Sequence, residues 1–189
     1  MSSQTEKPKS KKEERLYPFI LTVLKGLFEQ HFLGKAEVKE KIMGKPLDYN
    51  VYLETTAKGH FSEGLKEQLD DRALGIIRVE KFSPDIMGFI QETSSSKKEL
   101  ITVEVKARRI TIKDISRAKL YQDIFGATYG LLISTKRIPE EIRRFILDRY
   151  IIKGNLIIAQ FIETRNRLSI HPAFEHHVPE IFKKYTKLD

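Results

Sequence analysis

Hydrophobic residues recur at three- and four-residue spacing in several stretches of the chain, which is the period of an amphipathic helix. The first stripe predicts a helix over residues 16–31, and residues 35–43 predict a short second helix that ends at Gly44. Residues 61–73 return to helical spacing, with Ser62 as the N-cap. Three helices are therefore expected in the first part of the chain.

The second part of the chain alternates short apolar runs with helical stretches. Strands are expected at residues 76–82, 85–92, 99–109, 128–135 and 155–163, with helices at residues 112–125 and 139–154. Residues 47–56 alternate hydrophobic and polar positions and fit either a strand or an extended crossing segment. Three meandering strands followed by helical crossovers predict an α/β fold with a mixed central sheet flanked by helices.

Changes in composition divide the chain into four segments. Residues 1–15 are polar and are expected to form a disordered basic arm. Residues 16–58 are expected to be a helical N-terminal extension, residues 59–170 the core, and residues 171–189 a C-terminal segment. A length of 189 residues suits one compact domain with short additions.

Charge and cysteine content narrow the range of functions. Lys and Arg outnumber Asp and Glu by 34 to 26, and the formal net charge of +8 favours a polyanionic partner. The chain has no cysteine, which excludes disulfides and thiolate-bound metals and fits a cytoplasmic, intracellular location. No apolar run approaches the roughly 20 residues of a membrane-spanning helix, so no membrane partner is expected.

Two carboxylates and a lysine are expected to meet on paired strands. With the hairpin turn placed between residues 94 and 95, Asp85 lies opposite Glu104, with the two Cβ atoms roughly 5 Å apart. Lys106 shares the face of Glu104 because side chains alternate along a strand. Two bare carboxylates so placed would repel each other, so the pattern favours a divalent cation, Mg²⁺ or Mn²⁺, between them.

Lys106 would then lie beside the ion and the attacked phosphate. Its ammonium group could position or help to deprotonate a water molecule, and could stabilise negative charge in the transition state. The simpler alternative is that both carboxylates face solvent and that Lys106 is an ordinary ion-pair partner, worth under about 1 kcal/mol.

Pro84 and Asp85, followed after a gap of 18 residues by Glu104, Val105 and Lys106, resemble the signature of the PD-(D/E)XK nuclease superfamily. The predicted order of elements within residues 59–170 is also similar to the αβββαβ core of that restriction endonuclease-like fold. The resemblance implies metal-dependent cleavage of phosphodiester bonds, usually in DNA. It implies Asp85 and Glu104 as metal ligands and Lys106 as the catalytic lysine.

The resemblance further implies an acidic residue on the first helix of the core. Glu63 is the preferred candidate for this catalytic and metal-binding carboxylate because it stands at the start of the predicted helix. Glu67, one turn later, is the alternative.

Members of the superfamily often carry a Gln four residues before a Tyr on the helix that follows the third strand. Arg117 stands four residues before Tyr121 here, and Lys119 and Gln122 are candidate substitutes for the missing Gln. Tyr121 is expected to be a packing residue. The predicted phosphate-contacting residues are Arg108, Arg109, Lys113, Arg117 and Lys119.

Taken with the resemblance, the residues predict a Mg²⁺- or Mn²⁺-dependent deoxyribonuclease. The small basic chain favours structure-selective cutting, at a junction, a flap or an end. RNA as the substrate, endonuclease or exonuclease action, and a homodimer or larger nucleoprotein complex stay open. The alternative function is a catalytically silent nucleic-acid-binding subunit with the same fold.

Overall fold

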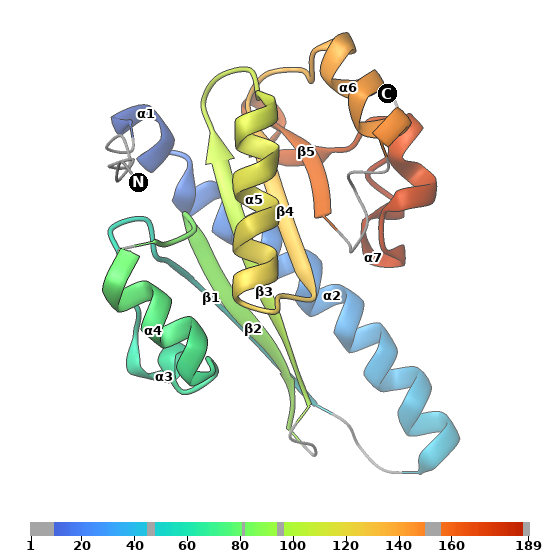
Figure 1. Ribbon diagram of the computed structural model, residues 1–189. Helices are drawn as coiled ribbons and strands as arrows, with labels where there is room; N and C mark the ends of the chain where they lie inside the picture. The colour runs from blue at the N-terminus through green and yellow to red at the C-terminus, as the bar shows by residue number, and fades with distance from the viewer. Residues whose placement is uncertain (1–9, 45–47, 81, 94–96, 150–155, 187–189) are drawn as a thin grey trace.

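The computed structural model describes residues 10–44, 48–80, 82–93, 97–149 and 156–186, in which one six-stranded mixed sheet has helices on both faces (Figure 1). The strands are β1 (Tyr49–Thr55), β2 (Ile86–Glu92), β3 (Lys98–Lys106), β4 (Tyr129–Ser134), β5 (Leu156–Ile162) and β6 (Arg167–Ser169). The α-helices are α1 (Lys11–Glu14), α2 (Tyr17–Met43), α3 (Glu63–Lys66), α4 (Asp71–Glu80), α5 (Ile112–Ile124), α6 (Glu140–Arg149) and α7 (Glu180–Lys183). The predicted α/β class is confirmed.

The order of the strands in the sheet follows their order in the chain. The first three strands form an antiparallel meander, β3 to β5 are parallel, and β6 returns antiparallel to β5. Ile86 pairs with Val103 in the β2–β3 hairpin, which is the register expected from the sequence. Asp85 and Glu104 are the next residues beyond this pair, and the Asp85 N–H donates to the Val103 carbonyl, so the predicted register of the hairpin is confirmed.

Helix α2 is one continuous helix, whereas the sequence predicted two, over residues 16–31 and 35–43. The helix runs through the exposed Gly34 and ends where predicted, at Gly44, which adopts the left-handed conformation and donates its N–H to the Glu40 carbonyl. One glycine inside a helix costs only about 1 kcal/mol, which the packing of α2 on the sheet outweighs.

The predicted extension, residues 16–58, is part of the main core. Ile20 and Phe28 of α2 are completely buried in the same hydrophobic cluster as Val103 of β3. Strand β1, from the same segment, pairs with β2. Helix α2 passes behind the sheet and α5 crosses in front of it (Figure 1). No boundary therefore separates this segment from the core, because its apolar face forms one of the two helical layers.

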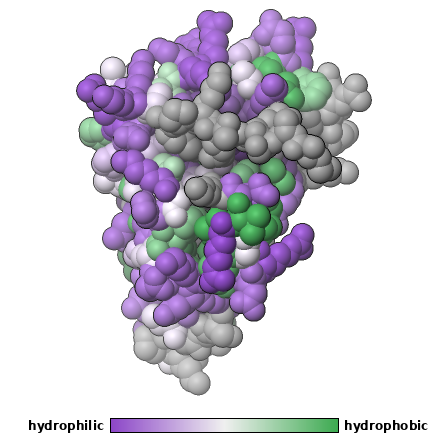
Figure 2. Space-filling view, turned by 60° about the vertical axis from the view of Figure 1, so that its left-hand side comes forward, coloured by the Kyte–Doolittle hydropathy of each residue, from purple (hydrophilic) through white to green (hydrophobic). Residues whose placement is uncertain are grey.

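Two short helices replace the predicted helix 61–73 and the predicted strand 76–82. Ser62 caps α3 as expected, by accepting the N–H of Leu65. Asp70 accepts the N–H of Ala73 at the start of α4. The run IIRVEKF is too short for its period to separate a strand from a helix. The side chains of α4 that join a second hydrophobic cluster with β2 are Ala73, Leu74 and Ile77. Figure 2 brings the side of α3 and α4 forward and shows a mostly hydrophilic face on which hydrophobic residues are exposed in several places.

The described residues near the two ends of the chain are ordered, which corrects part of the disordered arm predicted for residues 1–15. Ser10 and Glu13 form a capping box at α1, so residues 10–15 do not belong to a disordered arm, while residues 1–9 lie outside the described residues. In the C-terminal segment, Phe174 and Phe182 are buried in the main core. In the described ranges, no helix is both long and apolar enough to span a membrane.

Gly88 in β2 leaves no room for a side chain. A Cβ atom there would lie 2.0 Å from the carbonyl oxygen of Tyr52 and 2.9 Å from the Cα of Leu53, both in β1. We expect Gly88→Ala to lower the free energy of unfolding by about 3 kcal/mol, because β1 and β2 must separate. Urea denaturation measures this change.

Gly34→Ala is the matched control, since nothing lies within 4 Å of its added Cβ. This substitution should raise the free energy of unfolding by up to about 1 kcal/mol, because alanine is the better helix former. Equal stability of the two variants would contradict the tight β1–β2 approach.

Candidate active site

The carboxylate of Asp85 is completely buried at the point where the β2–β3 ladder ends. Its Oδ2 accepts the backbone N–H of Val105 at 2.6 Å, and its Oδ1 accepts the hydroxyl of Tyr17 at 2.8 Å. The backbone of Asp85 is fixed as well, because its N–H donates to Val103 and its carbonyl accepts the N–H of Thr56. The side chain of Asp85, the residue just before β2, thus accepts a backbone N–H of β3.

Glu104 and Lys106 lie at the C-terminal end of β3, a central strand with a neighbour on each side. The Glu104 side chain is inaccessible to solvent and that of Lys106 is 7% exposed. Lys106 Nζ donates to Glu104 Oε1 at 2.5 Å, and Nη1 of Arg117 on α5 lies 3.9 Å from the same oxygen. The two carboxylates do not face solvent, so that alternative is wrong, although Lys106 does form an ion pair.

The hydroxyl of Tyr17 lies among three carboxylates. Burial raises the pKa of Tyr17, and so do the negative charges of Asp85, Glu13 and Glu104 together with the hydrogen bond to Asp85. Asp85 is the carboxylate that accepts the hydrogen bond from this hydroxyl. With its pKa raised, Tyr17 stays protonated and serves as a hydrogen-bond donor.

Glu13 is a site carboxylate that sequence reasoning missed. The side chain is buried, with Oε1 accepting the N–H of Ala107 at 3.4 Å and Oε2 accepting the N–H of Ser10 at 3.2 Å. Ala107 directly follows Lys106, so Glu13 lies beside the end of β3. The spacing of Ser10 and Glu13 before a hydrophobic run is a capping-box signal that is visible in the sequence.

The structure does not bring Glu63 to this site. Glu63 lies on α3, its side chain is 84% exposed, and it forms an ion pair with Lys66 at 2.6 Å. The alternative candidate, Glu67, is also exposed. The physical reason is that α2, and not the helix near residue 63, is the first helix packed on the sheet. Helix α3 belongs to a segment inserted between β1 and β2.

Of the five predicted phosphate-contacting residues, three lie next to a carboxylate and two form no ion pair with a described residue. Arg108 donates two hydrogen bonds to Asp114, at 2.7 and 2.8 Å, and Lys119 forms an ion pair with Asp123. Arg117 lies near Glu104, as described above. The exposed Arg109 and Lys113 form no ion pair with any other described residue.

The loop after β4 adds two basic residues that sequence reasoning missed, Lys136 and Arg137. Both are exposed and form no ion pair within the described ranges. Strands β3 and β4 are parallel, and the N–H of Thr135 donates to the carbonyl of Lys106, so the two loops lie at one edge of the sheet. We call Arg109, Lys113, Lys136 and Arg137 the basic edge. Their position after parallel strands is the signal that could have found the last two.

Tyr121 and Gln122 on α5 are packing residues. Tyr121 is buried, with its ring 4.3 Å from that of Phe82, which confirms the packing role predicted for it. Gln122 is buried against Gly130, near the start of β4 and at the end of the strand opposite the basic edge. Arg117 is therefore the α5 residue that reaches Glu104.

The donor atoms at this site suit a hard divalent cation. Carboxylate oxygens are the ligands that Mg²⁺ and Mn²⁺ prefer, and Mg²⁺ is commonly held by one or two carboxylates plus water and substrate phosphate. Asp85 and Glu104 provide two such groups. In the described part of the chain, no group of three or more His, Asp or Glu residues has the arrangement of a metal site. The described residues thus offer two buried carboxylates at this site, without a third His, Asp or Glu arranged as a metal ligand.

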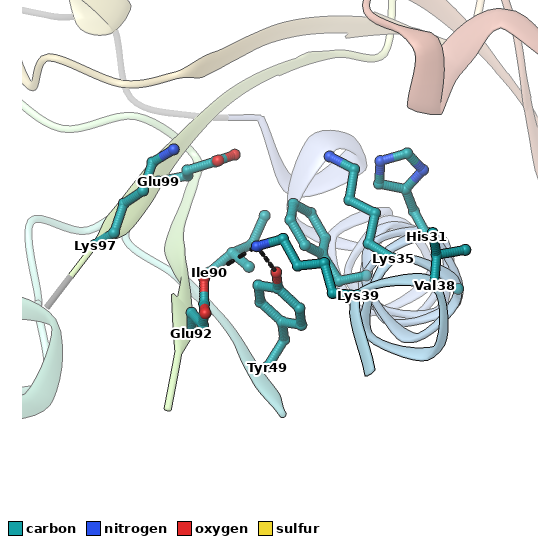
Figure 3. A pocket seen from close by; sticks show the side chains of 11 residues that line it. His31, Lys35, Val38, Lys39, Tyr49, Ile90, Glu92, Lys97 and Glu99 are labelled. Carbon is teal, nitrogen blue, oxygen red and sulfur yellow. Dashed lines mark hydrogen bonds and ion pairs between the residues drawn. The ribbon is translucent and has the colours of Figure 1, made fainter. Parts of the chain in front are cut away.

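A groove of about 570 Å³ lies away from this grouping, between α2 and the far ends of β1, β2 and β3 (Figure 3). Its polar lining is largely paired, with Lys39 Nζ 3.1 Å from the Tyr49 hydroxyl and 3.5 Å from Glu92. Asp85, Glu104 and Lys106 do not line it. The candidate site is therefore the buried grouping at the end of β3 and not this groove.

No protein-family model matches the chain, and no curated protein matches it.

The Arg108–Asp114 pair provides a test of the local electrostatics. Burial alone would raise the pKa of Asp114, but hydrogen bonds from Arg108 and Thr111 outweigh it, so the pKa lies below the ordinary value of 3.8. A lowered pKa in the folded state stabilises the protein above the unfolded pKa, and this contribution is lost as the pH falls through the folded pKa. We expect Arg108→Gln to raise the pKa of Asp114 and to reduce the stability that the protein loses as the pH falls.

Carboxyl resonances followed by NMR from pH 2 to 6 measure this pKa directly. Arg109→Gln is the control, because Arg109 is exposed and has no ion pair among the described residues. An unchanged Asp114 pKa in Arg108→Gln would contradict the role of the ion pair.

Proposed function

We propose that this protein is a Mg²⁺- or Mn²⁺-dependent nuclease of the PD-(D/E)XK type that hydrolyses phosphodiester bonds in DNA. The observation that carries the proposal is the buried grouping of Asp85, Glu104 and Lys106 at one end of β3. Burying charged groups costs several kcal/mol each unless partners compensate. A buried cluster of this kind on a basic protein favours a chemical role over a purely structural one.

The order of elements supports the same class. Helix α2, the meander β1–β2–β3, helix α5 and strand β4 follow the αβββαβ order of the restriction endonuclease-like core, with α3 and α4 inserted after β1. In this alignment the first helix is α2, and the carboxylate near its start is Glu13. The proposal therefore assigns to Glu13 the place that the sequence analysis gave to Glu63.

Each side chain has a separate part in the proposed reaction. Asp85 and Glu104 would hold the divalent cation, which supplies an activated water molecule and polarises the phosphate. Lys106 places its Nζ beside Glu104, where it can orient a water molecule and stabilise charge that develops on phosphate oxygens. Glu13, near the end of β3, accepts the Ala107 N–H and adds a third negative charge.

The basic edge supports a nucleic acid as the substrate. Arg109, Lys113, Lys136 and Arg137 are exposed around the end of the sheet where the buried grouping lies. Contacts from such residues to phosphates hold the backbone without reading the bases. This arrangement is consistent with cutting selected by DNA structure, at a junction, a flap or an end.

Substitution of the buried grouping tests the proposal. We expect Asp85→Asn and Lys106→Met each to lower Mn²⁺-dependent DNA cleavage by about 100-fold or more, because each removes a group that acts in the transition state. Initial rates on plasmid, branched and single-stranded DNA measure the effect, and EDTA should abolish cleavage. Asp123→Asn, an exposed carboxylate on α5, is the control and should leave the rate unchanged.

Two other results would contradict the proposal. Cleavage that survives both EDTA and Lys106→Met would come from a different site or a contaminant. DNA binding by the wild-type protein without cleavage of any substrate would instead establish a catalytically silent binding subunit.

A second comparison separates the two candidate helix carboxylates. We expect Glu13→Gln to lower the cleavage rate by about 10-fold, because it removes a negative charge beside the end of β3. Glu63→Gln should change the rate by less than about 2-fold, since Glu63 faces solvent on α3. Initial rates at one Mn²⁺ concentration compare the two variants. A larger loss in Glu63→Gln would restore the assignment made from the sequence.

A further inference from the structure

Tyr17 connects α2 to the candidate site. It is the first residue of α2 and lies 68 positions before Asp85 in the chain, yet its hydroxyl donates to Asp85 Oδ1 at 2.8 Å. The ring is buried, and its neighbours Leu16 and Ile20 belong to the main hydrophobic core. The position of the hydroxyl is therefore set by the packing of α2 against the sheet.

The two hydrogen bonds to Asp85 fix the plane of its carboxylate. Tyr17 donates to one oxygen and the backbone of Val105 to the other. A carboxylate oxygen has two lone pairs, so accepting one hydrogen bond does not by itself prevent it from binding a cation. Without the Tyr17 hydroxyl, Oδ1 would lose a donor in a buried site and rotation of the carboxylate would be less restricted.

We propose that Tyr17 is a positioning residue, which holds the Asp85 carboxylate in the orientation that binds a divalent cation. This inference rests on the proposed function and goes beyond it, because it makes the N-terminus of α2 a determinant of cation affinity. Hydrogen-bond partners of metal-binding carboxylates commonly change metal affinity by 10- to 100-fold.

Direct Mn²⁺ binding to the full-length protein tests this role. Electron paramagnetic resonance of free Mn²⁺ gives the dissociation constant for the wild type and for Tyr17→Phe, which keeps the buried ring and removes only the hydroxyl. We expect Tyr17→Phe to bind Mn²⁺ about 10-fold more weakly. In cleavage assays, the Mn²⁺ concentration for half-maximal rate should rise by a similar factor, while excess Mn²⁺ restores most of the rate.

Tyr129→Phe is the matched control. Tyr129 is also buried, and its hydroxyl is hydrogen-bonded to the carboxylate of Glu99. It lies at the start of β4, whereas Lys106 pairs with Ser134 at the other end of β4. This variant should bind Mn²⁺ as the wild type does, and thermal unfolding confirms that both variants are folded.

The outcomes separate the two proposals. An unchanged Mn²⁺ affinity in Tyr17→Phe, or an equal loss in Tyr129→Phe, overturns the positioning role and leaves the proposed function intact. A wild-type protein that binds no Mn²⁺ overturns the metal-dependent function and this inference with it.

Discussion

The hydrogen bonds to the Asp85 carboxylate join three parts of the chain that are distant in sequence. The acceptor stands before β2, one donor is the backbone of β3, and the other is the first residue of α2. An unpaired buried carboxylate would cost several kcal/mol, so these bonds are required for the end of the meander to close around it. The position of α2, the register of the hairpin and the geometry of the candidate site therefore depend on one another.

Charge balance gives the same region its second constraint. Glu104 is compensated by Lys106 and Arg117, and Arg108 is compensated by Asp114. These pairs neutralise part of the charge of the site, while the basic edge adds exposed cations that form no ion pair with any described residue. A polyanion that approaches this end of the sheet would thus meet positive charge first and the carboxylates only where a cation can bridge to them.

The sequence predicted the part of the site that depends on local periodicity. Side chains on β2 and β3 alternate between the two faces of the sheet, and a polar turn joins the two strands. The positions of Asp85, Glu104 and Lys106 therefore followed from the period of two residues. Glu13 and Tyr17 could not be placed in this way, because their contacts with Ala107 and Asp85 span 94 and 68 residues. The spacing of hydrophobic residues within one helix or strand gives no information on contacts between residues so far apart in the sequence. The segment 76–82 was assigned wrongly for a related reason, since seven residues are too few to separate the two periods.

Helix α1 has a practical consequence for handling the protein. The hydrogen bond from the Ala107 N–H to Glu13 joins this helix to the end of β3, and an affinity tag placed before residue 1 would be attached only about 12 residues before Glu13. Because imidazole groups bind divalent metal ions, a polyhistidine tag at that end would add competing ligands to a Mn²⁺-binding measurement. Helix α7, the last described helix, lies on the opposite side of the molecule from α1 (Figure 1), so a tag after the last residue is the better choice for metal-binding measurements.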